Sequence, residues 1–193
     1  MVIKLTILED VNNKPGKHKM KNTYWMQNGI QVVRQRIPVG DYVLVNDRIS
    51  DVFSRKEKRG IEVKMMDLMG TYNIAVDSKK DIQELCGNVC GPQHARFRDE
   101  CVLAMNNNIK LYVVVENADG ITDLRDLHRW VNPRLFIRRG GKQLYPQATR
   151  GLTLMKSCMT MEHKYKPLEF IFCRPEHAGA VIVALLEGGV WNG

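Results

Sequence analysis

Residues 74–79 read IAVDSK: a short apolar run leads into Asp77, and Lys79 follows two positions later. A second apolar run leads to residues 40–42, GDY, whose acid is Asp41. Carboxylate oxygens are the ligands that Mg²⁺ and Mn²⁺ prefer, so two strands that end in acids predict a hard-metal site. Such a metal stabilises charge on phosphoryl oxygens and lowers the pKa of a bound water. With a lysine to hold that water or neutralise the phosphate, the pattern indicates phosphodiester hydrolysis.

The charge balance of the chain favours a polyanionic partner. Its 193 residues include 29 Lys and Arg against 21 Asp and Glu, which gives a formal net charge of +8. Nucleic acid is the first partner that such a balance suggests and an anionic membrane surface the second. A basic protein that binds no polyanion is the remaining alternative. The length suits one domain with a sizeable core, and we expect a single domain over residues 1–193.

Membrane insertion and export are not indicated by the sequence. No apolar stretch approaches the roughly 20 residues that a membrane span requires. The N-terminus runs directly into a strand pattern, without the basic segment and long apolar region of a signal peptide. We therefore expect a cytoplasmic protein, in a bacterial or phage-infected cell if the resemblance described below holds.

Apolar periodicity predicts alternating strands and helices. The expected strands cover residues 3–8, 30–37, 42–45, 72–76, 109–116 and 168–172, with 30–37 and 42–45 joined as a hairpin. The expected helices cover residues 17–27, 81–89, 94–105, 124–130, 152–165 and 178–186. The strongest strand, 109–116, reads IKLYVVVE and suggests burial on both faces. The mixture predicts an α/β fold with a central sheet flanked by helices.

Two stretches are dense in basic residues: 55–60, expected to be a solvated or mobile loop, and 132–150, expected to be loop-like. We expect their cations to bind the DNA backbone with strong salt dependence, a solvated surface being the alternative. The candidates are Arg55, Lys56, Lys58, Arg59, Arg138, Arg139 and Lys142. Arg96 either contacts a phosphate or pairs with Glu100 one helical turn later. Glu100 is either that surface partner or an acid that supports the metal ligands. Lys21, in the basic helix 17–27, either lines the DNA path or belongs to a solvated face.

Four motifs in order carry a family resemblance: GDY at residues 40–42, VDSK at 76–79, ARFRDE at 95–100 and IKLYVVVE at 109–116. Together they resemble the XPF-type nuclease domain, part of the PD-(D/E)xK restriction-endonuclease-like superfamily. The resemblance covers about residues 3–117, and the tail resembles small, free-standing members from bacteria and their phages. It implies a restriction-endonuclease-like central mixed sheet flanked by helices, with residues 118–193 packed on this core.

The resemblance also implies roles for individual residues. It implies that Asp10, Asp41 and Asp77 bind Mg²⁺ or Mn²⁺, and that Asp41, Asp77 and Lys79 form the catalytic set. Asp10 has a structural alternative, because an acid before an Asn-rich turn often caps that turn.

The chain departs from the family pattern in five places. Asp77 is a shorter acid than the glutamate of the pattern, and Asn13 stands where an extra acid is expected. Ser78 stands where the pattern has an arginine, which removes a charge that could help to hold a phosphate. Gln83 stands where an acid is expected, and residues 46–70 make the interval between the central acids long. The departure at Ser78 puts the substrate contacts in question more than the hydrolysis.

The expected function is that of a metal-dependent DNA endonuclease that cuts branched or flapped DNA in repair, recombination or phage replication. Relatives dimerise, so a homodimer is an additional expectation. One alternative is a Holliday-junction-resolvase-like or restriction-like nuclease with the same site. A second is an inactive DNA-binding relative, motivated by Ser78 and Gln83, and a third is a basic α/β binding protein without a nucleic-acid role.

Overall fold

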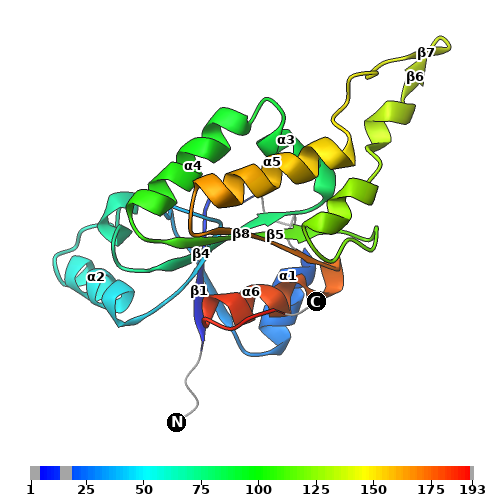
Figure 1. The fold of residues 1–193 in the computed structure, drawn as a ribbon. Coiled ribbons are helices and arrows are strands. Elements are labelled where there is room, and N and C mark those ends of the chain that lie inside the picture. The colour runs from blue at the N-terminus through cyan, green and yellow to red at the C-terminus, as the bar shows by residue number, and fades with distance from the viewer. Residues whose placement is uncertain (1–4, 14–18, 192–193) are drawn as a thin grey trace.

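A six-stranded mixed sheet forms the centre of the protein (Figure 1). The computed structural model describes residues 5–13 and 19–191. The strand order is β2-β1-β3-β4-β5-β8, in which β3 runs antiparallel to both of its neighbours and the other pairs are parallel. The strands are β1 (Thr6–Glu9), β2 (Gln31–Arg34), β3 (Tyr42–Leu44), β4 (Ile74–Lys79), β5 (Lys110–Glu116) and β8 (Leu168–Cys173).

Helices cover both faces of the sheet (Figure 1). One face carries α1 (Lys19–Gln27) and α6 (Ala178–Leu186). The other carries α3 (Ile82–Val89), α4 (His94–Asn106) and α5 (Gly151–Lys164). This arrangement explains the apolar run of β5, since a strand between two helical layers is buried on both faces. The mixed α/β sheet with flanking helices confirms the expected fold class.

The remaining elements are short or peripheral. Helix α2 (Asp47–Lys58) follows β3. The 3₁₀ turns are η1 (Met65–Leu68), η2 (Arg125–Arg129), η3 (Pro133–Phe136) and η4 (Pro175–His177), and a separate hairpin consists of β6 (Arg138–Arg139) and β7 (Lys142–Gln143). In the described part of the chain, every helix is too short or too polar to span a lipid bilayer. The part after residue 117 supplies β8 to the central sheet and one helix to each face.

The expected hairpin of residues 30–37 and 42–45 is wrong. Both strands pair with β1, which lies between them: Leu8 is opposite Val33 of β2 in a parallel pair and opposite Val43 of β3 in an antiparallel pair. The connection of residues 35–41 therefore crosses over β1 instead of forming a tight turn. The first residues of the expected strand 3–8 and helix 17–27 lie outside the described residues.

The expected loop at residues 55–60 is also wrong, because most of it belongs to helix α2. Asn46 caps this helix by accepting a hydrogen bond from the Ile49 amide at 3.0 Å, and Ile49 and Val52 are buried. The basic residues Arg55, Lys56 and Lys58 occupy the last turn of α2, where the helix dipole favours positive charge. Capping and an apolar stripe therefore prevail over the density of charge.

Strand β4 continues through the expected strand end. Asp77 and Lys79 lie opposite Val113 and Val115 of β5, so they point to one face of the sheet while Ser78 points to the other. Asp77 and Lys79 face the layer of α3, α4 and α5, and Ser78 faces α1. Since β3 runs opposite to β4, its first residues lie at the edge where β4 and β5 end, and α2 leaves from the opposite edge.

Candidate active site

Asp41 is held directly against the backbone of β4. Its amide donates to the Val76 carbonyl at 2.8 Å, and its Oδ2 accepts from the Ser78 amide at 2.9 Å. This close approach depends on Gly40, which has φ of +79° and lies so near β4 that an added Cβ would be 3.0 Å from the Val76 carbonyl oxygen. Only glycine tolerates both conditions. The GDY turn thus brings Asp41 beside Asp77.

Lys79 is fixed between an acid and an aromatic ring. Its Nζ lies 2.5 Å from Oδ2 of Asp77, and both side chains are buried. The same ammonium lies 5.3 Å from the centroid of the Phe97 ring, which α4 contributes from above the sheet. An ammonium over a ring face is stabilised by the ring quadrupole. The lysine is therefore positioned at the acids rather than free in solvent.

Glu100 joins this group from α4. Its Oε1 accepts a hydrogen bond from the Gly40 amide at 2.9 Å, which ties α4 to the GDY turn. This contact favours the interpretation of Glu100 as an acid near the metal ligands over that of a surface partner of Arg96. The signal was present in the sequence, because Glu100 follows the buried Phe97 by three residues and so shares its helical face.

The three carboxylates repel one another. Burial raises the pKa of Asp41 well above its ordinary value, and the charge of Asp77 raises it further. Burial and then Asp77 raise the pKa of Glu100 to about 7. Burial lowers the pKa of the Lys79 ammonium, but Asp77, Asp41 and Glu100 outweigh that effect and leave it raised. One cation therefore faces three acids, a surplus of negative charge that a divalent metal would neutralise.

The donor chemistry of Asp41, Asp77 and Glu100 suits Mg²⁺ or Mn²⁺, because all three offer hard carboxylate oxygens. Across residues 5–13 and 19–191, however, no three His, Cys, Asp or Glu side chains are spaced as a ready metal-binding group. A protein donor contacts one oxygen of each acid: Ser78 N, Lys79 Nζ and Gly40 N. Metal binding would require these side chains to draw together.

Asp10 forms the contacts of a turn cap. Its Oδ1 accepts from the Asn12 amide at 2.7 Å and its Oδ2 from the Ile37 amide at 3.1 Å. Its own amide donates to the Asp41 carbonyl at 2.8 Å. The carboxylate thus stabilises the backbone next to Asp41, and both of its oxygens accept hydrogen bonds from backbone amides. This geometry favours the structural interpretation of Asp10, and metal ligation by it stays a prediction.

The opposite face of β4 carries a second lysine–carboxylate pair. Lys21 of α1 is 2% exposed, and its Nζ donates to Ser78 Oγ at 3.0 Å and forms an ion pair with Glu116 at the end of β5. Placing Lys21 on a DNA path or a solvated face was therefore wrong. The cation at Ser78 is thus buried and paired, on the face of β4 away from Asp77 and Lys79.

The two basic stretches lie apart. Three cations of α2 lie in its last turn, and one of them, Lys56, pairs with Asp67 at 2.7 Å. Arg138, Arg139 and Lys142 are exposed on the β6–β7 hairpin, which the chain reaches after β5 ends. The second stretch is therefore reached from the edge of the sheet at which β4 and β5 end.

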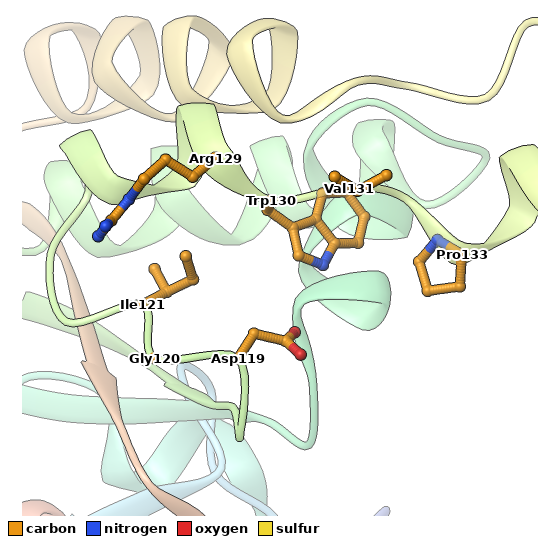
Figure 2. Close-up of a pocket in the computed structure, with 7 residues that line it drawn as sticks. All are labelled: Asp119, Gly120, Ile121, Arg129, Trp130, Val131 and Pro133. Atoms are coloured by element: carbon orange, nitrogen blue, oxygen red, sulfur yellow. The ribbon is translucent and has the colours of Figure 1, made fainter.

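A pocket of about 360 Å³ lies where the chain leaves β5 for that hairpin, and Figure 2 shows its walls. Trp130 and Ile121 provide apolar walls, and Asp119 and Arg129 bring charge from different sides. Gly120, Val131 and Pro133 complete the lining. The pocket shares no residue with the acid cluster, so it does not enter the proposed chemistry.

Comparison with known proteins gives one informative structural likeness. No protein-family model matches the chain, and no curated protein matches its sequence. Among solved structures the chain is similar to XPF from Aeropyrum pernix in complex with DNA, with a TM-score of 0.56 and 16% sequence identity over 95% of this chain. The match spans 64% of that structure's chain, less than two thirds of its length. At this identity the likeness shows the fold alone, and it agrees with the expected restriction-endonuclease-like central mixed sheet flanked by helices.

Proposed function

We propose that the protein is a divalent-metal-dependent DNA endonuclease. The observation that carries the proposal is the convergence of Asp41, Asp77 and Glu100 with Lys79 at one edge of the sheet, where burial and the charge of Asp77 raise the pKa of Asp41 and of Glu100. Perturbed acids beside a fixed lysine are typical of catalytic sites. The similar structure is an XPF bound to DNA, and the net charge of +8 suits the same partner.

Mg²⁺ or Mn²⁺, when bound, supplies charge stabilisation at the phosphoryl oxygens and a water of lowered pKa. Asp41 and Asp77 would hold the ion, and Glu100 would supply a third carboxylate from α4. Lys79 would turn from Asp77 towards the scissile phosphate or the attacking water. In the structure its ammonium lies 5.3 Å from the centroid of the Phe97 ring.

The proposed substrate is branched or flapped DNA, in repair, recombination or phage replication, cut by a cytoplasmic enzyme that works as a monomer or a homodimer. A junction resolvase or restriction-like nuclease would use the same acids and differ only in the DNA geometry it accepts. The inactive DNA-binding relative is disfavoured, because Asp41, Asp77 and Lys79 are all present. Asp41 accepts a hydrogen bond from the Ser78 amide of β4, and Lys79 forms an ion pair with Asp77.

The test is a cleavage panel with end-labelled flap, fork, four-way junction and plain duplex DNA. Each substrate is incubated with the protein in EDTA, in Mg²⁺ and in Mn²⁺, and the product position is mapped on a sequencing gel. We expect cleavage of a branched substrate only with a divalent metal, and none by Asp77→Asn, which should still bind DNA. DNA binding without cleavage in any metal would support the inactive relative, and cleavage in EDTA would contradict the proposed chemistry.

A further inference from the structure

Residues 131–150, which we name the arm, are unusual in charge. They contain five basic residues and no acid, the basic residues being Arg134, Arg138, Arg139, Lys142 and Arg150. The arm leads from η2 through η3 and the β6–β7 hairpin to α5, and Figure 1 shows the hairpin projecting away from the sheet and its helices. At the hairpin tip, Gly140 and Gly141 both have positive φ, which permits the tight reversal.

The arm also exposes large apolar side chains beside its cations. Phe136 is 70% exposed, and Ile137, Leu144 and Tyr145 are each more than two-fifths exposed. The backbone that presents them is ordered by hydrogen bonds, since the Leu144 amide donates to the Ile137 carbonyl at 2.9 Å and Gln143 Nε2 donates to the Leu135 carbonyl. A cluster of exposed apolar side chains on one projection indicates a binding surface.

The mixture of residues identifies the partner that fits. Arg134 lies 5.7 Å from the centroid of the Tyr145 ring, so a cation and an aromatic face stand side by side. Proteins that hold single-stranded nucleic acid combine such cations, which bind phosphates, with aromatic rings on which bases stack. Paired bases within a duplex offer no free face for stacking. The arm therefore fits unpaired bases better than a fully paired duplex.

The position of the arm connects it with the acid cluster. The chain enters the arm after the end of β5 and leaves it into α5, and β5 ends at the same sheet edge as β4, which carries Asp77 and Lys79. A DNA molecule with its scissile phosphate at this edge could therefore extend to the arm. The charge and the position of the arm thus agree.

We propose that the arm binds the unpaired bases of the DNA substrate, with Phe136 and Tyr145 stacking on bases and the arm cations binding the adjoining phosphates. This inference rests on the proposed function, because it assigns the arm to the DNA that the acid cluster cuts. It gives the protein a preference for DNA in which a duplex meets a single strand.

The test measures binding by fluorescence anisotropy in EDTA, where cleavage does not interfere. The probes are a labelled duplex with a single-stranded tail and a fully paired duplex of equal length. We expect the double variant Phe136→Ser, Tyr145→Ser to bind the tailed duplex about tenfold more weakly, as the loss of base stacking predicts. Its affinity for the paired duplex should remain that of the wild type. Met26→Ser, at a position 74% exposed on α1, is the matched control and should change neither affinity.

A charge variant separates stacking from phosphate binding. We expect Arg138→Gln, Arg139→Gln, Lys142→Gln to weaken binding to the tailed duplex at low salt and to reduce the salt dependence of that affinity. The slope against the logarithm of salt concentration should fall by about 0.7 for each single-strand phosphate contact removed. An unchanged slope would contradict a role of the arm cations in phosphate binding.

Three results for the double variant Phe136→Ser, Tyr145→Ser would overturn the proposal. The first is an equal loss of affinity for both probes, and the second is no loss of affinity for either. The third is a change from a wild-type dimer to a monomer in sedimentation, which would make the arm a protein interface. The wild-type cleavage panel distinguishes this failure from that of the proposed function. If the wild type cuts branched DNA and the stacking variant binds the tailed probe normally, only the arm assignment fails. If the wild type binds tails through the arm but cuts nothing, only the proposed nuclease fails.

Discussion

The two faces of β4 each hold a buried lysine beside a carboxylate, yet their surroundings differ. On one face Lys79 meets three acids at the edge of the sheet, and all three acids contribute to its raised pKa. On the other face Lys21 meets one acid, Glu116, and the Ser78 hydroxyl beneath the α1 and α6 layer. The first face has surplus negative charge, and the second is balanced. Surplus charge suits a metal and chemistry, whereas balance suits a structural ion pair.

The largest effect is expected on the surplus face. Lys79→Met should reduce metal-dependent cleavage by about 10²–10⁴-fold, the usual contribution of a positioned proton donor or acceptor. The same variant should bind Mg²⁺ more tightly, because the acids lose their competing cation. Cleavage rates and metal-induced shifts in melting temperature check both outcomes.

The neighbouring Lys80→Met is the matched control for that prediction. Lys80 is exposed, and its Nζ forms a long contact of 3.8 Å with Oδ2 of Asp81. Its loss should therefore change neither cleavage nor metal affinity. Equal loss of cleavage in the two variants would mean that general positive charge, and not the position of Lys79, supports the reaction.

On the balanced face the effect should be on folding. Lys21→Met leaves Glu116 buried without its cation and should lower the free energy of unfolding by about 3–5 kcal/mol. Adding Glu116→Met should restore most of that loss, since apolar replacement of a whole buried pair is often neutral. Urea unfolding of both variants and of Lys19→Met, an exposed position on α1, measures this. If Lys21→Met were as stable as the wild type, the structural role of the pair would be contradicted.

The surplus face should also give stability a pH dependence. The pKa of Glu100 is raised from 4.5 to about 7, so its protonated form favours the folded state. Its stabilising contribution is therefore complete below pH 4.5 and is lost as pH rises through about 7. In EDTA we expect the wild type to lose stability over this interval and Glu100→Gln to lose less. Melting curves check this, with exposed Glu57→Gln as control; identical profiles for wild type and Glu100→Gln would contradict it.

The smallest effect is expected at Ser78. Ser78→Ala removes one acceptor from Lys21, which keeps its ion pair with Glu116, so the free energy of unfolding should fall by about 1 kcal/mol. Cleavage should stay within about twofold of the wild type, since the hydroxyl faces away from Asp77 and Lys79. A large loss of cleavage with unchanged stability would show that the two faces are not separate.

Local patterns predicted the main elements of the fold. The valine run of β5 and the apolar residues of α6 gave strand and helix close to the observed bounds, because burial on one or both faces is written in the sequence period. The same patterns placed Asp41 and Asp77 next to neighbouring strands, which the structure brings together.

Long-range contacts were not predictable in this way. Lys21 and Glu116 are 95 positions apart, and nothing local in a basic helix shows that one of its lysines is buried. Glu100 reaches the acids only because α4 packs across β4 and meets the GDY turn. The predicted pairing of β2 with β3 was wrong for the same reason, since the insertion of β1 between these strands depends on tertiary contacts.

The most direct test of the separation between the faces is a parallel measurement on Asp77→Asn and Lys21→Met. Flap-DNA cleavage in Mg²⁺ or Mn²⁺ and urea unfolding in EDTA are recorded for both variants and the wild type. We predict that Asp77→Asn loses about 10³-fold or more in cleavage, as several kcal/mol of metal stabilisation implies, and keeps its stability within about 1 kcal/mol. Lys21→Met should show the reverse: lower stability with cleavage retained by the folded fraction. Wild-type cleavage by Asp77→Asn would contradict the account.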